Sequence, residues 1–164
     1  MKFCEGRFEF QFPNALTGFR FDEPDRNLST FHGLSHCMKA VDFVVELEHR
    51  YLFIEVKDMF DPDSYQNSDA FNHLKSVLIK KYRDSFLYRW AEEKLDKPVT
   101  YLCLIELENP IINQLTREMQ IHLPTSVPKN SRWLKPIAAH CQILNSERWN
   151  HNFPAWPLRL RMNA

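Results

Sequence analysis

The chain has 164 residues, of which 44% are apolar and 26% charged. This length and composition suit one domain with a buried core and exclude the disordered and collagen-like classes. Its 21 Lys and Arg balance 21 Asp and Glu, so no overall basic field indicates a nucleic-acid partner. The charge is uneven, because residues 1–58 carry seven basic and ten acidic side chains (net −3) and residues 125–164 carry six and one (net +5). A basic surface for a polyanion and an ordinary uneven distribution both remain open.

The sequence contains no signal for a membrane or for secretion. No run approaches the ~20 consecutive apolar residues of a membrane helix, and the first ten residues, MKFCEGRFEF, lack the apolar core of a signal peptide. The four cysteines are far apart, and reduced thiols are the simplest account of them. We therefore expect a cytoplasmic protein that makes no membrane contact.

The first 37 residues predict strands followed by a loop. Phenylalanines at alternate positions of residues 3–21 have the period of two that is typical of strands. Pro13-Asn14, with Gly18, would divide this segment into two strands. Residues 22–37 are polar and rich in turn-forming residues, which favours a loop with at most one short helical turn.

Residues 39–57 predict a β-hairpin, in which Glu48-His49-Arg50 separates the apolar runs KAVDFVVEL and YLFIEVK. A two-residue turn at Glu48-His49 would place Asp42 directly opposite Glu55, whereas a three-residue turn would shift the register by one. Because side chains alternate between the two faces of a strand, one face is wholly apolar and the other carries the charges. The predicted apolar face is Val41, Phe43, Val45, Leu52, Ile54 and Val56, and the mixed face is Ala40, Asp42, Val44, Glu46, Tyr51, Phe53, Glu55 and Lys57.

The rest of the chain predicts helices alternating with strands. Residues 58–68 form a polar loop, and Ser68 or Asp69 would cap a helix from about 70 to 95. Residues 99–107 predict a central strand, Pro110 begins a second helix to about 121, and a strand near 137–144 precedes an ordered tail. The expected buried stripe of the first helix is Phe71, Leu74, Leu78, Tyr82 and Phe86. These elements predict a single α/β domain over residues 1–164, of α+β type, with a central mixed sheet flanked by helices.

The charges of the predicted hairpin have two interpretations. Like-charged carboxylates facing each other across a strand pair are unfavourable, and a divalent cation between Asp42 and Glu55 would reverse the sign of that interaction. Mg²⁺ prefers such hard oxygen ligands, and the Lys57 ammonium on the same face would act on a metal-activated water or on a phosphate. The alternative is a sheet with one face in water, on which these side chains are solvated or paired with neighbours.

Asp42, twelve intervening residues and then Glu55-Val56-Lys57 resemble the core signature of the PD-(D/E)XK nuclease superfamily, which has the restriction-endonuclease-like fold. The resemblance covers residues 39–107. It implies that Asp42, Glu55 and the Val56 carbonyl bind Mg²⁺ or Mn²⁺, that Lys57 is the catalytic lysine, and that the protein cleaves DNA or, less often, RNA.

The chain departs from this family at two points. Val41 replaces the proline of the family's name. The family's N-terminal helix, which carries an acidic residue, has no counterpart in the strands predicted here, so Glu9 would take that role only if its segment were helical. A catalytically inactive domain of the same fold, which binds nucleic acid or protein, is therefore the alternative. Since the net charge is neutral, a protein partner or a homo-oligomer would contribute to the affinity for nucleic acid.

Several other residues are candidates for a role in binding. Lys75, Lys81 and Arg83 on the first helix are weak candidates for nucleic-acid contacts. Packing of the aliphatic stem is the alternative for Lys75, and a solvated helix face is the alternative for Lys81 and Arg83. The spacing of His32, His36 and Cys37, with distant His140-Cys141, suits zinc only loosely, so loop histidines and a buried thiol are favoured. Base stacking and packing onto the core are both open for the C-terminal aromatic residues, and the interleaved prolines favour packing. These residues are Trp149, Phe153 and Trp156.

Overall fold

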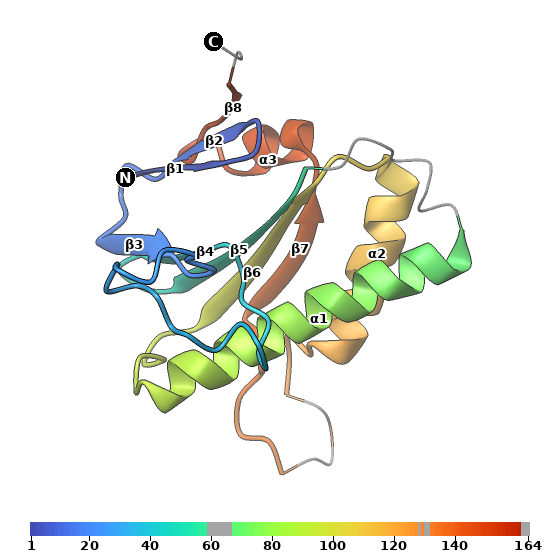
Figure 1. Ribbon diagram of the computed structural model, residues 1–164. Coiled ribbons are helices and arrows are strands. Elements are labelled where there is room, and N and C mark those ends of the chain that lie inside the picture. Colours follow the sequence, from blue (N-terminus) through green and yellow to red (C-terminus); the bar gives the residue numbers. More distant parts are fainter. Residues whose placement is uncertain (59–66, 128, 130–131, 162–164) are drawn as a thin grey trace.

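The computed structural model describes residues 1–58, 67–127, 129 and 132–161 (Figure 1). In chain order the elements are β1 (Lys2–Glu5), β2 (Phe8–Gln11), β3 (Thr17–Arg20), β4 (Phe43–Glu46), β5 (Tyr51–Lys57), α1 (Ser68–Ala91), β6 (Val99–Ile105), α2 (Asn109–His122), β7 (His140–Leu144), α3 (Ser146–Asn152) and β8 (Leu158–Leu160). The larger sheet has the order β3-β4-β5-β6-β7, and the smaller one has the order β1-β2-β8. Because β3, β4 and β5 pair antiparallel and β5, β6 and β7 pair parallel, the central sheet is mixed. The predicted α+β class is confirmed.

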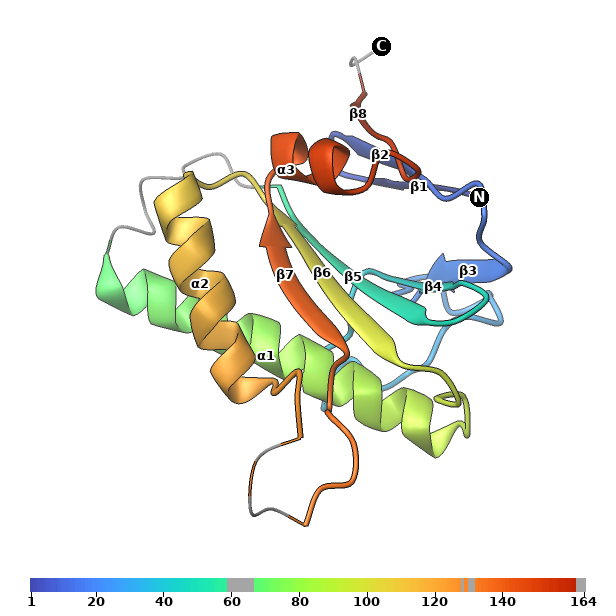
Figure 2. The same cartoon turned by 180° about the vertical axis from the view of Figure 1, so that it is seen from behind.

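Both faces of the larger sheet are covered. Helices α1 and α2 lie on one face, and β1, β2, β8 and α3 lie on the other (Figures 1 and 2). The alternation along β5 follows these layers, since Tyr51 and Phe53 join the core beneath α1 while Leu52 and Ile54 join the core on the opposite face. The mixed face of the predicted hairpin therefore lies beneath a helix, and only its ends, at Glu46 and Lys57, are partly exposed among the described residues.

The hairpin has the predicted register. Phe43 pairs with Ile54 and Glu46 with Tyr51, and the Leu47 amide donates to the Arg50 carbonyl, which closes the turn at residues 48 and 49. One assignment within it is wrong. Val41 lies in the core beneath α1 and not with Phe43, because β4 begins at Phe43 and the alternation of a strand does not extend back to residue 41.

The N-terminal segment forms three short strands where two were predicted. Gly6, in a left-handed backbone conformation with φ 53°, turns the chain between β1 and β2. The alternate phenylalanines Phe8, Phe10 and Phe12 are fully buried, as their period predicted. They pack with Trp149 of α3, whose ring centroid lies 5.2 Å from that of Phe10. Packing of the tail onto the core is thus confirmed for Trp149.

The long helix begins as predicted, with a different cap. The side chain of Asn67, not of Ser68 or Asp69, accepts the hydrogen bond from the Asp69 amide, and the helix ends at Ala91, four residues earlier than expected. The first four residues of the predicted stripe are buried and Phe86 is half-buried. Of the predicted loop 58–68, residues 59–66 lie outside the described part of the chain.

The remaining elements agree with the sequence except at the C-terminus. Strand β6 lies in the interior of the sheet and every one of its residues is buried, as expected of a central strand. The predicted ordered tail contains the short helix α3 and the strand β8, which pairs with β2. Among the described residues, no helix combines the length and the hydropathy needed to cross a bilayer.

Candidate metal and catalytic site

Asp42 and Glu55 meet at the end of the hairpin that lies away from its turn. Asp42 directly precedes β4, and its Oδ2 accepts a hydrogen bond of 2.6 Å from the Val56 amide of β5. Since the N–H and C=O of one residue in a strand point to the same side, the Val56 carbonyl faces the side on which Asp42 lies. The predicted juxtaposition of the two carboxylates and this carbonyl thus follows from the register and one side-chain hydrogen bond.

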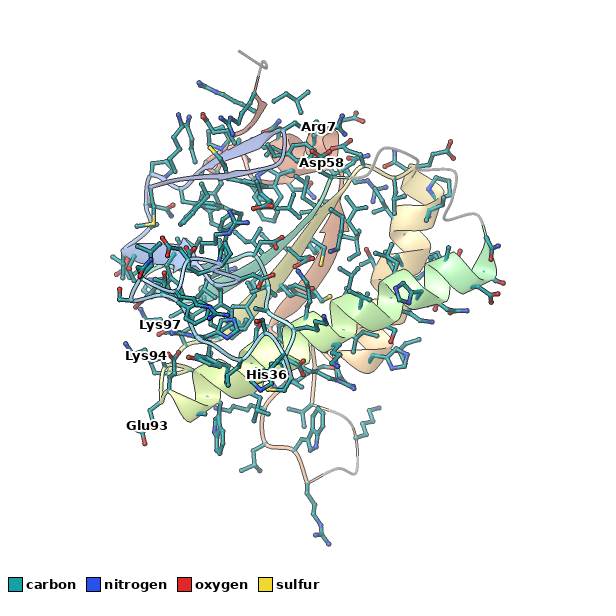
Figure 3. All side chains as sticks on the ribbon, in the orientation of Figure 1. Arg7, His36, Asp58, Glu93, Lys94 and Lys97 are labelled. Carbon is teal, nitrogen blue, oxygen red and sulfur yellow. The ribbon has the colours of Figure 1, made fainter. Side chains whose placement is uncertain are left out.

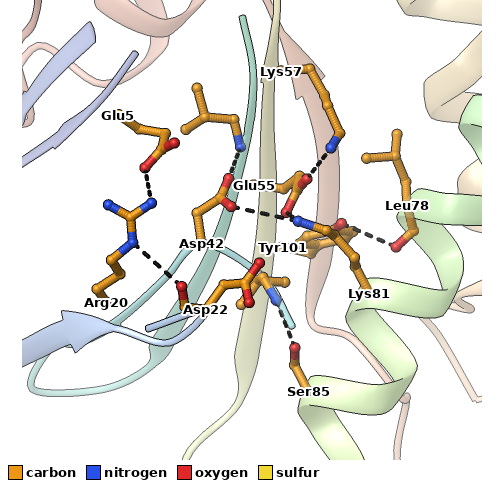
Figure 4. A network of polar contacts seen from close by, with 12 residues as sticks. Glu5, Arg20, Asp22, Asp42, Glu55, Lys57, Leu78, Lys81, Ser85 and Tyr101 are labelled. Carbon is orange, nitrogen blue, oxygen red and sulfur yellow. Dashed lines mark hydrogen bonds and ion pairs between the residues drawn. The ribbon is translucent and has the colours of Figure 1, made fainter. Parts of the chain in front are cut away.

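Lys81 of α1 contacts both carboxylates. It extends from α1, and its Nζ lies 2.8 Å from Glu55 Oε2 and 3.5 Å from Asp42 Oδ1 (Figure 4). Glu55 is fully buried, and Asp42 and Lys81 are 7% and 9% exposed. The sequence suggested Lys81 as a nucleic-acid contact, but the structure places its ammonium inside the site, within reach of both carboxylates.

Lys57 lies on the open side of the same cluster. Its Nζ is 2.9 Å from Glu55 Oε1, and its side chain is 29% exposed. The two lysines therefore contact the two different oxygens of Glu55, one from beneath the helix and one from the solvent side (Figure 4). The predicted group of Asp42, Glu55 and Lys57 comes together, and Lys81 adds a fourth member to it.

Burial and neighbouring charges shift the pKa values of the central pair. Desolvation first, and then the like charge of Asp42, raise the pKa of Glu55 to about 7 although Lys81 and Lys57 oppose the shift. For Lys81, desolvation alone would lower the pKa, but Glu55 and Asp42 together outweigh it and the pKa is raised. Lys81 is thus held as an ammonium, while Glu55 is close to taking up a proton at neutral pH. A carboxyl with so perturbed a pKa beside specific charged partners is typical of a functional site.

Three further charged residues surround Asp42 and were not found from the sequence. Arg20 of β3 contacts Glu5 Oε2 at 2.7 Å through Nη2, and its Nε donates to the Asp22 carbonyl at 3.4 Å (Figure 4). The pKa of Glu5 is raised, chiefly by desolvation, with Arg20 opposing the shift and Asp42 adding to it. The N-terminal acidic residue near the site is therefore Glu5, whereas Glu9 pairs with Lys2. No local pattern marks Glu5, because only the packing of β1 against the hairpin brings it there.

Asp58, the residue after Lys57, is held by two contacts with Arg7. The Arg7 amide donates to Asp58 Oδ2 at 3.1 Å, and Arg7 Nε lies 2.9 Å from Asp58 Oδ1. Figure 3 shows these two side chains together at the turn between β1 and β2. A Cβ on Gly6 would lie 2.5 Å from Asp58 Oδ2, so only glycine allows this close approach.

The other candidates from the sequence lie outside this cluster. Lys75 pairs with Glu118 of α2, and Arg83 donates to the His122 carbonyl at 2.9 Å. His36 and Cys37 are exposed in the loop before Asp42, whereas Cys141 is buried in the core. Among the described residues, no three His, Cys, Asp or Glu side chains are arranged to bind one metal ion. A metal in the candidate site would thus rest on two carboxylates and a backbone carbonyl.

The donor set nevertheless suits a small divalent cation. One ammonium lies within 3.5 Å of an oxygen of each carboxylate, so these oxygens already share a single cation. Both are hard oxygen donors of the kind that Mg²⁺ and Mn²⁺ prefer. A metal held by the same oxygens would compete with Lys81.

Comparisons with known proteins add no relative: no family model, curated protein or solved structure matches this chain.

Proposed function

We propose that this protein is a metal-dependent phosphodiesterase of the PD-(D/E)XK type that acts on DNA or, less often, RNA. The observation that carries the proposal is the convergence of Asp42, Glu55 and two lysines at the end of a buried hairpin. A buried ion-pair network contributes little net stability, because desolvation offsets most of the attraction. Its use in chemistry is a more economical account than its use in folding.

The residues divide the chemistry between them. Asp42, Glu55 and the Val56 carbonyl would hold the cation, and a bound Mg²⁺ or Mn²⁺ would supply Lewis acidity to the phosphodiester and to the attacking water. Lys57, partly open to solvent, would place a positive charge beside the phosphate as negative charge develops on it. Glu55 must be ionised to bind the cation, so cation binding displaces its proton near neutral pH.

The rival function is an inactive binding domain in which Lys81 permanently takes the place of a metal. The contact of one ammonium with both carboxylates favours this rival specifically. On that account Mg²⁺ and Mn²⁺ have no effect on the melting temperature, and no nucleic acid is cleaved.

The experiment compares wild type, Asp42→Asn and Lys57→Met in two assays. For wild type we expect Mn²⁺ or Mg²⁺ to raise the melting temperature and to allow cleavage of single-stranded or duplex DNA. Asp42→Asn should lose both properties, whereas Lys57→Met should keep the metal-dependent stabilisation and lose cleavage. Glu48→Gln is the matched control, because its carboxylate lies on the same hairpin and is 79% exposed. Wild type that is neither stabilised by metal nor able to cleave DNA or RNA would favour the binding domain.

A further inference from the structure

A concave site lies near the predicted catalytic cluster, between the loop after β3 and the C-terminal part of α1. It is a cavity of about 200 Å³ walled by aromatic rings. Phe19, Phe31, His32 and Tyr88 each contribute a half-buried ring, and polar and charged side chains line the rest of the cavity. The rings of Phe31 and His32 are nearly parallel, at 13°, and that of Tyr88 stands at 62° to His32. Such walls accept a flat ring.

The cavity lining also includes a buried arginine, Arg89. The Arg89 side chain is only 8% exposed, and its guanidinium carbon lies 5.4 Å from the centroid of the Phe19 ring. Its Nη1 pairs with Glu92 at 2.6 Å, but its Nε is buried without a hydrogen-bond acceptor among the described residues. A buried donor without an acceptor costs free energy, and a ligand that supplies the acceptor would recover it.

The charges and hydroxyl groups around Arg89 indicate which chemical groups the ligand must carry. Ser29 and Thr30 bring hydroxyl groups that both donate and accept hydrogen bonds. Lys94, at the C-terminal end of α1 (Figure 3), adds a second cation to Arg89 against the single carboxylate of Glu92. The cavity therefore combines ring walls, a polar edge and a net positive charge. A nucleobase with its adjoining phosphate has all three complementary features.

The position of the cavity relates it to the cluster around Asp42. The Phe21 amide, at the cavity wall, donates to the Asp42 carbonyl at 2.8 Å. Lys81 and Arg89 lie eight residues apart on α1, which is about 12 Å along the helix axis. At about 3.4 Å per nucleotide in a stacked strand, this separation corresponds to roughly three or four nucleotides.

We propose that this cavity binds one unpaired nucleobase of a single-stranded nucleic acid whose backbone passes the Asp42–Glu55 cluster. The choice of ligand rests on the proposed function, but the binding itself requires no cleavage. A base inside a duplex is stacked on both faces and paired along one edge, so it cannot enter the cavity without leaving the stack. The proposal predicts a preference for single strands.

The test measures fluorescence anisotropy of an end-labelled single-stranded DNA hexanucleotide and of its duplex, in EDTA. Phe31→Leu removes a ring from a half-buried loop position, and Arg89→Lys keeps the charge but removes the planar guanidinium and Nε. We expect each to weaken single-strand binding about fivefold or more and to leave duplex binding unchanged. Leu28→Ala, in the same loop, and Arg50→Gln, which removes an exposed positive charge, are the controls and should stay within about twofold of wild type.

The outcomes separate this proposal from the catalytic one. Equal binding of single strand by wild type and by natively folded Phe31→Leu overturns the base-binding cavity, whatever the cleavage assay shows. If Arg89→Lys does not fold, the single-strand binding of Phe31→Leu alone tests the cavity. Single-strand binding that depends on Phe31, in a protein that cleaves nothing with Mg²⁺ or Mn²⁺, supports the cavity and rejects the nuclease.

Discussion

Replacing Lys81 with Met tests whether its buried ammonium neutralises the site. Met keeps an unbranched stem but leaves Asp42 and Glu55 without the cation that they share at 3.5 and 2.8 Å. Removing one partner of a buried ion pair costs about 3–5 kcal/mol when the remaining charge has no other way to be neutralised. Here Glu55 has one, because its pKa is already raised to about 7 and rises further without Lys81. The cost must therefore depend on pH.

The size of the loss in unfolding free energy depends on whether Glu55 is protonated in the variant. At pH 6 the carboxyl of the variant takes up a proton, and we expect a loss of only about 1 kcal/mol of unfolding free energy. At pH 8 the variant must either bury an ionised Glu55 or protonate it against the solution, at about 1.4 kcal/mol per pH unit. We expect about 3 kcal/mol there, which corresponds to a fall of roughly 6–12 °C in melting temperature for a chain of this length.

Urea unfolding in EDTA at the two pH values measures these losses. Lys80→Met is the control, because Lys80 is the exposed neighbour on the same helix and should change stability by less than about 0.5 kcal/mol. The same measurement with Mn²⁺ should stabilise Lys81→Met more than wild type, since the metal no longer competes with the ammonium. Equal stability of variant and wild type at pH 8 would refute the reasoning. Metal stabilisation of wild type alone would show that Lys81 supports the metal and does not replace it.

Two further predictions concern the pH dependence and the turn at Gly6. Because the pKa of Glu55 in the folded protein, about 7, lies above the ordinary glutamate value of 4.5, its contribution to stability is full below pH 4.5 and is lost as the pH rises through 7. In EDTA, urea unfolding from pH 5 to 8 should thus show wild type losing roughly 3 kcal/mol more than Glu55→Gln, and parallel curves would contradict the assignment. Gly6→Ala combines a left-handed φ of 53° with a Cβ 2.5 Å from Asp58 Oδ2, whereas Gly33→Ala has a similar φ of 71° and its nearest atom at 3.5 Å. Thermal melting should show Gly6→Ala to be the more destabilised by about 1–2 kcal/mol, and equal losses would mean that the contact with Asp58 contributes nothing.

Local patterns predicted the hairpin, the two longer helices and β6, and three of the four members of the charged cluster. The register of the β4–β5 hairpin follows from one turn length, because a shift of one residue would turn every apolar side chain to the wrong face. The two-residue turn, one of the two turn lengths that the sequence left open, therefore places Asp42 beside Glu55. Lys57 follows by parity, being two residues after Glu55 on the same strand.

The rest of the site depends on tertiary packing, which no local pattern encodes. Lys81 lies 26 residues from Glu55, and its position at the edge of the apolar stripe of the helix indicated only a weak candidate for a nucleic-acid contact. Which carboxylates it meets depends on how α1 crosses the sheet. Glu5 belongs to the second sheet, and only the packing of that sheet against the hairpin brings it near Asp42. The predicted face of Val41 was wrong for a related reason. Side chains alternate between faces only within a strand, and Val41 precedes β4.

The two lysines of the cluster differ in their exposure to solvent and in the number of carboxylates that they contact. Lys81 is 9% exposed and contacts both carboxylates, so its charge is worth most when no other cation is present. Among the described residues, Lys57 pairs with the single carboxylate of Glu55, and because its side chain is 29% exposed, solvent screens the attraction. Under the proposed function, its ammonium would be able to turn toward a phosphate. If a divalent cation binds, the flexible four-carbon stem of Lys81 would allow the ammonium to withdraw, and the two ion pairs of Lys81 would be lost. The proposed nuclease and its rival, a neutralised binding domain, therefore differ in which cation the two carboxylates hold, and the protonation of Glu55 affects that competition.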